Sequence, residues 1–176
     1  MTFEPTQVDG AWLVGLERHE DDRGFFARLW DASEFEARGL AGSLDQCSLS
    51  YNRRAGTVRG MHYQAAPCEE IKVVRCVRGS IYDVLLDLRP ASATYRQWVG
   101  RELTSENRLC CYVPKGVAHG FQTLTDDAEV LYLIAGPYDP GLARGVRWND
   151  PAFNIRWPLT AAGISDRDRL YPDFGA

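Results

Sequence analysis

Residues 71–88 read IKVVRCVRGSIYDVLLDL, two apolar runs separated by the triplet Arg78-Gly79-Ser80. β-Branched side chains dominate the first run, as is usual for strands, and the glycine supplies a turn. The segment therefore predicts a β-hairpin. Similar short apolar runs, ended by Gly, Pro and Asp, occupy most of the remaining chain, and this pattern favours an all-β fold.

Two further strands are predicted at residues 109–113 and 129–134. One short helix is expected at residues 31–39, with Asp31 and Ser33 as candidate caps and Gly39 as its stop. Many short strands with few helices are typical of an antiparallel β-barrel or jelly roll.

The composition favours one globular domain spanning residues 1–176, because neither a repeat nor a linker interrupts the chain. Hydrophobic residues make up 45% of the chain, near the globular average. The net charge of -4 and the pI of about 5.4 argue against nucleic-acid binding, which usually needs a basic surface. No apolar run approaches the roughly 18 to 20 residues of a membrane helix, so no membrane association is expected.

A cytoplasmic location is expected from the first residues and the cysteines. The start MTFEPT lacks the basic and then apolar segments of a signal peptide. The five cysteines are odd in number and form no Cys-x-x-Cys pair. This usage indicates reduced thiols instead of a disulfide framework or a zinc site.

Two of the three histidines lie in settings that suggest chemistry. His62 belongs to RGMHYQ, where strand alternation puts it on one face with Gly60 and Gln64. His119 belongs to PKGVAHGF, just after a predicted turn. Both could be barrel-lining residues satisfied by buried carboxylates, although a small barrel can also hold one ligand. His19 lies in a charged run and is expected in a solvated loop.

Lys72 and Asp83 interrupt the two apolar runs of the opening segment. A lysine on an apolar strand face is costly unless it meets an anion. The alternative is a lysine that protects an edge strand from aggregation. Asp83 could orient a histidine, or it could lie on the polar face of a half-solvated strand.

Two tyrosines are candidates for ligand contact. Tyr132 lies within the apolar run VLYLI, so it is either a core residue or an acid whose hydroxyl points into a cavity. Tyr138 follows at a strand exit, where its ring could stack on a base. A metal site is a weaker interpretation, because HYQ offers one histidine where metal-binding barrels use His-x-His.

These segments occur in an ordered series that covers roughly residues 8–170. The motifs are RGMHYQ (59–64), KVVR (72–75), GSIYD (79–83), DLR (87–89), PKGVAHGF (114–121), EVLY (129–132), GVRWNDP (145–151) and ISDRD (164–168). The series resembles the dTDP-4-dehydrorhamnose 3,5-epimerases. The resemblance implies a cupin-type β-barrel, no metal or other cofactor, and a homodimer.

The resemblance also implies site roles. His62 matches the general base and Asp168 the carboxylate that pairs with it. Lys72 matches the residue that stabilises the sugar enolate, and Tyr132 the acid that returns a proton from the other face. Asp83 would support His119. Positions that contact the substrate or its nucleotide are matched by Arg23, Gln46, Ser48, Arg59, His119, Tyr138 and Arg167.

This chemistry suits these residue types. The hydrogens on C3 and C5 of a 4-keto sugar lie next to a carbonyl, so an imidazole tuned near neutral pH can remove them. The enolate needs a fixed positive charge in a dry site, which a lysine on an apolar strand supplies. Inversion needs reprotonation from the opposite face, hence a separate acid. Arginines would bind the diphosphate of the nucleotide-sugar substrate.

Three places depart from the family pattern: Arg28 and Ala143 replace glutamates, and the stretch after Gln46, which often contains an asparagine, reads Cys47-Ser48-Leu49. The predicted activity is epimerisation of a nucleotide-linked 4-keto-6-deoxyhexose at C3, C5 or both. The departures keep several alternatives open. These are a mono-epimerase, a keto-isomerase, a sugar-nucleotide binding module without activity, and a metal-dependent oxygenase.

Overall fold

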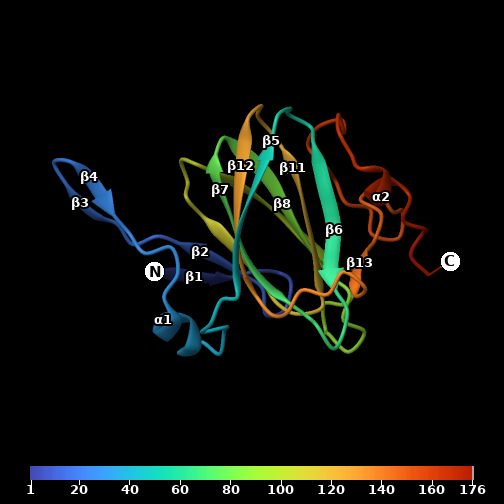
Figure 1. Ribbon diagram of the computed structural model, residues 1–176, viewed down its shortest axis with the longest axis horizontal. Helices are drawn as coiled ribbons and strands as arrows, with labels where there is room; N and C mark the ends of the chain where they lie inside the picture. Colours follow the sequence, from blue (N-terminus) through green and yellow to red (C-terminus); the bar gives the residue numbers. More distant parts are fainter. Residues whose placement is uncertain (176) are drawn as a thin grey trace.

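The computed structural model describes residues 1–175, which form two antiparallel sheets that face each other (Figure 1). The six-stranded sheet has the order β1 (Thr2–Pro5), β2 (Trp12–Gly15), β10 (Cys110–Val113), β7 (Ile71–Arg78), β12 (Ala128–Ala135), β5 (Gln46–Asn52). The five-stranded sheet has the order β13 (Ala143–Gly145), β6 (Val58–Gln64), β11 (Val117–Thr123), β8 (Ser80–Asp87), β9 (Trp98–Thr104).

The main hydrophobic core lies between the two sheets. It contains Val74 of β7, Leu85 of β8 and Phe121 of β11, all fully buried. Burying one such side chain stabilises the fold by about 1.5–3 kcal/mol. The architecture confirms the predicted all-β, cupin-type barrel, and its only helices within residues 1–175 are α1 (Ala32–Glu36) and α2 (Asp166–Arg169).

The predicted hairpin at residues 71–88 is wrong, although both of its strands exist. β7 pairs with β10 and β12, whereas β8 pairs with β11 and β9 in the other sheet. Gly79, with φ of +73°, therefore carries the chain from one sheet to the other. Alternation reveals which side chains face the core, but it does not reveal the neighbouring strand.

The other predicted elements are present with small shifts of their ends. β10 and β12 correspond to the strands expected at 109–113 and 129–134. In α1, Asp31 is the N-cap, and its carboxylate accepts a 3.1 Å hydrogen bond from the Glu34 amide. No helix among the described residues is long and apolar enough to span a bilayer. All five cysteines are free thiols.

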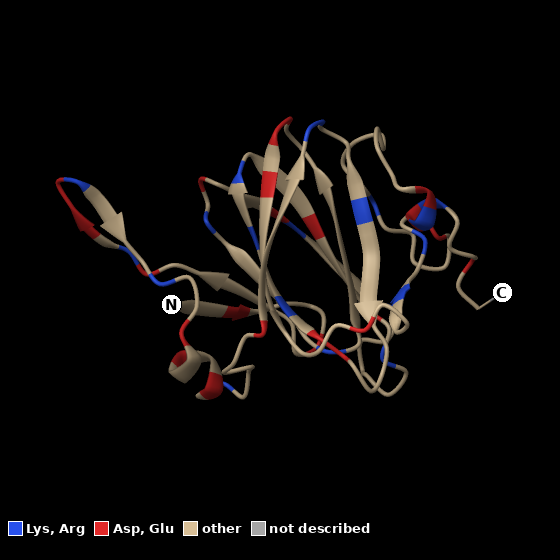
Figure 2. Ribbon diagram, viewed as in Figure 1, with Lys and Arg blue, Asp and Glu red and all other residues tan. Residues whose placement is uncertain are grey.

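A two-stranded arm of β3 (His19–Asp21) and β4 (Gly24–Phe26) projects away from the barrel (Figure 1). Charges of both signs lie along it (Figure 2). His19 is exposed, as predicted, but it lies in a strand and not in a loop. The side chains of Phe25 and Phe26 remain 40% and 70% exposed, so the arm buries little of its apolar surface within this chain.

Candidate active site

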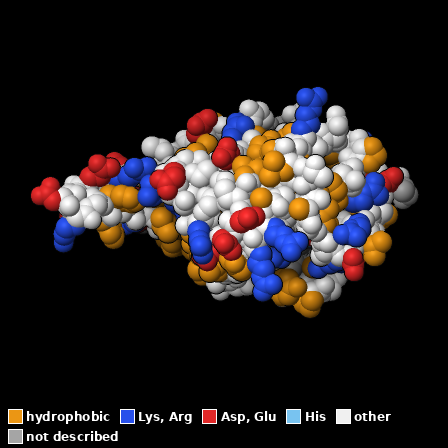
Figure 3. Space-filling view, turned by 90° about the horizontal axis from the view of Figure 1, so that it is seen from above, with side chains coloured by type: hydrophobic (Ala, Val, Ile, Leu, Met, Phe, Trp, Pro, Cys, Tyr) orange, Lys and Arg blue, Asp and Glu red, His pale blue; other side chains and the backbone are white. Residues whose placement is uncertain are grey.

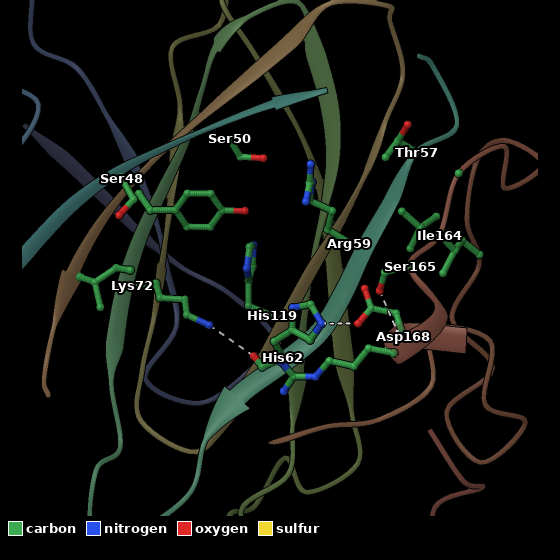
Figure 4. A pocket seen from close by; sticks show the side chains of 15 residues that line it. Ser48, Ser50, Thr57, Arg59, His62, Lys72, His119, Ile164, Ser165 and Asp168 are labelled. Atoms are coloured by element: carbon green, nitrogen blue, oxygen red, sulfur yellow. Dashed lines mark hydrogen bonds and ion pairs between the residues drawn. The ribbon is translucent and has the colours of Figure 1, made fainter. Parts of the chain in front are cut away.

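A cavity of about 570 Å³ opens between the sheets, large enough for a small-molecule ligand. Strands from both sheets and the segment leading into α2 line it. Figure 4 shows His62, Lys72, His119 and Arg59 converging on this space. Lys72 comes from β7 of the six-stranded sheet, and the other three come from β6 and β11 of the five-stranded sheet. Ionisable side chains that can exchange protons or bind an anion thus meet at one concave site.

His62 and Asp168 form a hydrogen-bonded pair at the cavity wall, with 2.6 Å between Nε2 and Oδ1 (Figure 4). The second carboxylate oxygen of Asp168 accepts a 3.3 Å bond from the Gly60 amide. Ser165 caps α2 by accepting a 3.1 Å bond from the Asp168 amide, which fixes the aspartate at the helix start. The imidazole stays 38% exposed toward the cavity while the carboxylate side chain is only 5% exposed.

The environment of Asp168 keeps it ionised. Burial by itself would raise the pKa of this carboxyl, but the hydrogen bond and charge of His62, together with the Gly60 amide, hold the pKa below its usual value. A carboxylate in this position orients the ring and stabilises the imidazolium that forms when the ring accepts a proton.

An irregularity in β6 brings Arg59 to the same cavity as His62. His119 pairs with His62 but Phe121 pairs with Arg59, so β6 has one extra residue there. Simple alternation would place Arg59 and His62 on opposite faces. Gly60 makes the distortion possible, because its φ is +140° and a Cβ there would lie 2.5 Å from the Gly120 Cα.

His119 and Asp83 form a second pair, 2.7 Å apart, deeper in the barrel. Asp83 is fully buried and His119 is 3% exposed. The solvated-face alternative for Asp83 is therefore wrong. His119 lines the cavity, whereas Asp83 contacts it only through the histidine.

Lys72 lies on a central strand, so the edge-strand alternative is wrong. It is paired across β7 with Val113 of β10 and Ile134 of β12. Its ammonium donates a 3.3 Å hydrogen bond to the His62 carbonyl (Figure 4) and lies 2.9 Å from a carboxylate oxygen of Glu70. A charged donor is thus held in the wall of the cavity.

Tyr132 lines the cavity beside His119, whose ring it meets edge-on at a centroid distance of 5.9 Å. Burial raises the pKa of the Tyr132 hydroxyl well above its usual value, and the negative charge of Asp83 adds to this while Arg59 opposes it. The phenol therefore stays protonated at neutral pH and is available as a proton donor.

The remaining expected contact residues divide into two groups. Ser48, directly opposite Tyr132 on β5, lines the cavity, as do Arg59 and Arg167. Arg59 is held by a 2.7 Å bond from its Nε to the buried Asn52. Within residues 1–175, Arg23, Gln46 and Tyr138 are not part of the cavity wall, and Arg23 lies in the projecting arm.

Sequence reasoning missed several residues of the wall, namely Ser50, Thr57, Ile164 and Ser165. Ser50 could have been found, because it is two residues from Ser48 on one strand and so shares its face. The others depend on the approach of distant segments. Among the described residues, no group of three or more His, Cys, Asp or Glu side chains is arranged to hold a metal ion.

The family model of dTDP-4-dehydrorhamnose 3,5-epimerase matches residues 5–175. The chain is 37% identical to the enzyme of that name from Sinorhizobium fredii, over 98% of this chain and 89% of the relative. It is 38% identical to a dTDP-4-dehydrorhamnose 3-epimerase from Streptomyces niveus, over 96% and 82%.

Solved structures agree in fold. The 3,5-epimerase of Bacillus anthracis, with TDP and PPi bound, has a TM-score of 0.93 at 38% identity and covers 98% of both chains. The Legionella pneumophila enzyme in complex with dTDP-4-keto-L-rhamnose has a TM-score of 0.88 at 32% identity, covering 95% of this chain and 89% of that one. The resemblance seen in the motifs is therefore confirmed, and the chain belongs to the dTDP-4-dehydrorhamnose 3,5-epimerase family.

Proposed function

We propose that this protein epimerises a dTDP-linked 4-keto-6-deoxyhexose, with His62 as base and Tyr132 as acid. The observation that carries the proposal is the convergence of the His62–Asp168 pair, Lys72 and a protonated Tyr132 on one cavity. The ligands of the similar structures, TDP and a dTDP-keto sugar, give the substrate class.

The reaction follows from the roles of these groups. His62 takes the proton from the carbon next to the ketone, and the C–H electron pair moves into the enolate. Lys72 stabilises the negative charge that develops on the ketone oxygen. Tyr132 then delivers a proton to the opposite face of the carbon, which inverts it. Because the neighbouring ketone takes up the negative charge, the reaction needs only a base, an acid and a positive charge near the ketone oxygen.

The direct test is proton NMR of dTDP-4-keto-6-deoxyglucose incubated with the protein in heavy water. Deuterium at both C3 and C5 is the expected result for a double epimerase. A relocated ketone in the product would indicate a keto-isomerase instead. Tight binding of the sugar nucleotide without exchange at either carbon would refute the proposal and favour a binding module.

The matched variants for this test are His62→Ala and His19→Ala. Each removes one imidazole, but His19 is exposed on the arm and does not line the cavity. Exchange should be lost in the first variant and retained in the second. Full exchange in folded His62→Ala protein would exclude His62 as the base.

Mono-epimerisation is the second candidate. A relative of 38% identity is a 3-epimerase, so the family fold allows inversion at a single carbon, and Ser48 lies directly opposite the acid Tyr132. Since the orientation of the sugar decides which carbon faces His62, a changed wall next to Tyr132 can restrict inversion to one carbon. A product inverted at C3 alone in the same experiment would establish this candidate, and a product inverted at both carbons would exclude it.

A homodimer is proposed as the working form, in the cytoplasm. Several large apolar side chains remain exposed, namely Phe26 on the arm, Leu29 in the loop that follows it, and Leu49, Tyr51 and Val77 on β5 and β7 of the six-stranded sheet. Apolar side chains are visible along the arm in Figure 3. A second copy that covers this surface would bury it, and the arm would be long enough to approach that copy.

In such a dimer, Arg23 would contact the nucleotide in the partner's cavity. Sedimentation should first show a dimer. Mixing Arg23→Ala with His62→Ala chains should then restore activity, because one cavity of each mixed dimer has both an intact base and an intact arginine. A monomer in solution, or mixed dimers without restored activity, would refute this arrangement.

A further inference from the structure

The ammonium of Lys72 has more contacts than its expected role requires. A lysine has three N–H donors. The Lys72 ammonium donates one hydrogen bond to the His62 carbonyl at 3.3 Å and forms an ion pair with Glu70, with 2.9 Å between Nζ and Oε1. These two contacts restrict where the ammonium can lie, and they leave donor capacity for a ligand in the cavity.

Glu70 is held in place by its surroundings. It immediately precedes β7, and the end of β12 passes close to it at Gly136. A Cβ on Gly136 would lie 2.8 Å from the Glu69 carbonyl and 3.1 Å from the Glu70 Cα, so only glycine permits this approach. The backbone that carries the carboxylate is thus packed against the strand that carries Tyr132.

The Glu70–Lys72 pair differs from an ordinary surface ion pair. Both side chains are only 11% exposed. Exposed pairs contribute little because water screens them, whereas removing one partner of a buried pair leaves an unpaired charge at a high cost. Glu70 does not line the cavity itself, so it has access to the substrate only through Lys72.

We propose that Glu70 is a positioning residue that holds the Lys72 ammonium in the orientation that stabilises the enolate. The inference rests on the proposed function, in which Lys72 meets the ketone oxygen. Without the carboxylate, the long lysine side chain is free to rotate away from the site where charge develops. The rate of proton abstraction is then expected to fall, while binding of the nucleotide, which the proposed function assigns to other residues, is unchanged.

The first experiment observes the ammonium directly and does not depend on activity. The chain contains only two lysines, Lys72 and the exposed Lys115, so protein labelled with ¹⁵N-lysine gives at most two side-chain signals. Hydrogen bonding slows exchange of ammonium protons with water. At neutral pH, the Lys72 signal should be visible in the wild type and disappear in Glu70→Ala. Persistence of the signal in Glu70→Ala would overturn the proposal.

The second experiment measures catalysis with three variants. Glu70→Ala should lower the rate of deuterium exchange about tenfold to a hundredfold, as expected when a catalytic group is misplaced. Glu70→Gln keeps an oxygen acceptor and should recover part of that loss. Glu69→Gln is the matched control, because it removes the same charge from a neighbour that forms no ion pair within residues 1–175. The dissociation constant for TDP should be the same in all of them.

The outcomes separate this inference from the proposed function. Absence of exchange in the wild-type protein would refute the proposed function, while the ammonium signal would still report the Glu70 contact. Wild-type exchange rates in folded Glu70→Ala, or an equal loss in Glu69→Gln, would refute the positioning role. A loss confined to thermal stability, with an unchanged exchange rate, would likewise show that Glu70 is only structural.

Discussion

The substitution Asp168→Asn tests how much the carboxylate of Asp168 contributes to proton abstraction by His62. The change keeps the size of the side chain and removes its charge from a position 2.6 Å from the His62 Nε2. Asp168 is 3% exposed, so water cannot replace the lost charge from that side. The imidazolium formed during proton abstraction would then face a neutral amide.

The magnitude follows from the geometry. A hydrogen bond to a charged group contributes about 1.5–3 kcal/mol, and about 1.4 kcal/mol corresponds to tenfold in rate. The His62 ring is 38% exposed, and solvent there compensates part of the loss, which favours the lower half of that range. We expect deuterium exchange to slow about tenfold to thirtyfold, with unchanged affinity for TDP.

The assay is the exchange rate at C3 and C5 followed by proton NMR in heavy water. Asp166→Asn is the control, because Asp166 lies exposed on the same helix and is not part of the cavity wall. Wild-type exchange in Asp168→Asn would refute the assignment of this carboxylate. An equal loss in both variants would show that the effect comes from the helix and not from the pair.

Three further predictions concern the acid, the close approach of β11 to β6, and the buried carboxylate of Asp87. Tyr132→Phe should keep deuterium exchange at the carbon facing His62 but lower formation of the inverted product about 10²–10⁴-fold, measured by NMR of the product. Gly120→Ala should destabilise the fold by about 1–3 kcal/mol in denaturant unfolding, because its Cβ would lie 2.7 Å from the Met61 Sδ and 2.9 Å from the Arg59 carbonyl. Burial alone would raise the pKa of the fully buried Asp87, but hydrogen bonds from Arg89 and its neighbours hold it well below the usual value. Its stabilising effect is therefore complete above the unfolded pKa of about 3.9 and is lost as the pH falls further toward the folded pKa. Asp87→Asn should lose about 3 kcal/mol at neutral pH and show a weaker decline on acidification, measured by urea unfolding at several pH values.

Local sequence patterns identified many residues of the candidate site. Lys72 and Asp83 each break an apolar run, and such interruptions indicate a polar group that has a buried partner. The structure provides those partners in Glu70 and His119. The family resemblance implied that Asp83 supports His119, and the two residues lie on neighbouring strands of the five-stranded sheet. The apolar pattern around Lys72 did not indicate its partner, because Glu70 is only one of two adjacent glutamates that precede β7.

The sequence also did not determine where several of the expected nucleotide-contacting residues lie in the structure. Arg23 and Tyr138 were matched to nucleotide contacts, yet neither lines the cavity within the described residues. The arm that carries Arg23 leaves the barrel altogether (Figure 1). Matching motifs assigns residues to a site without saying which chain of an assembly contributes them.

The sequence by itself determined the all-β class, the family and the chemically unusual residues, because short-range alternation and ordered motifs are local properties of the chain. Only the tertiary structure decided that residues 71–88 cross between sheets instead of forming a hairpin. It also decided that an extra residue in β6 turns Arg59 toward His62, and that Asp168, 106 residues away in sequence, meets that histidine. These contacts depend on which distant segments pack against each other. Local hydrophobic periodicity does not encode that choice, because it reports only which face of each strand is buried.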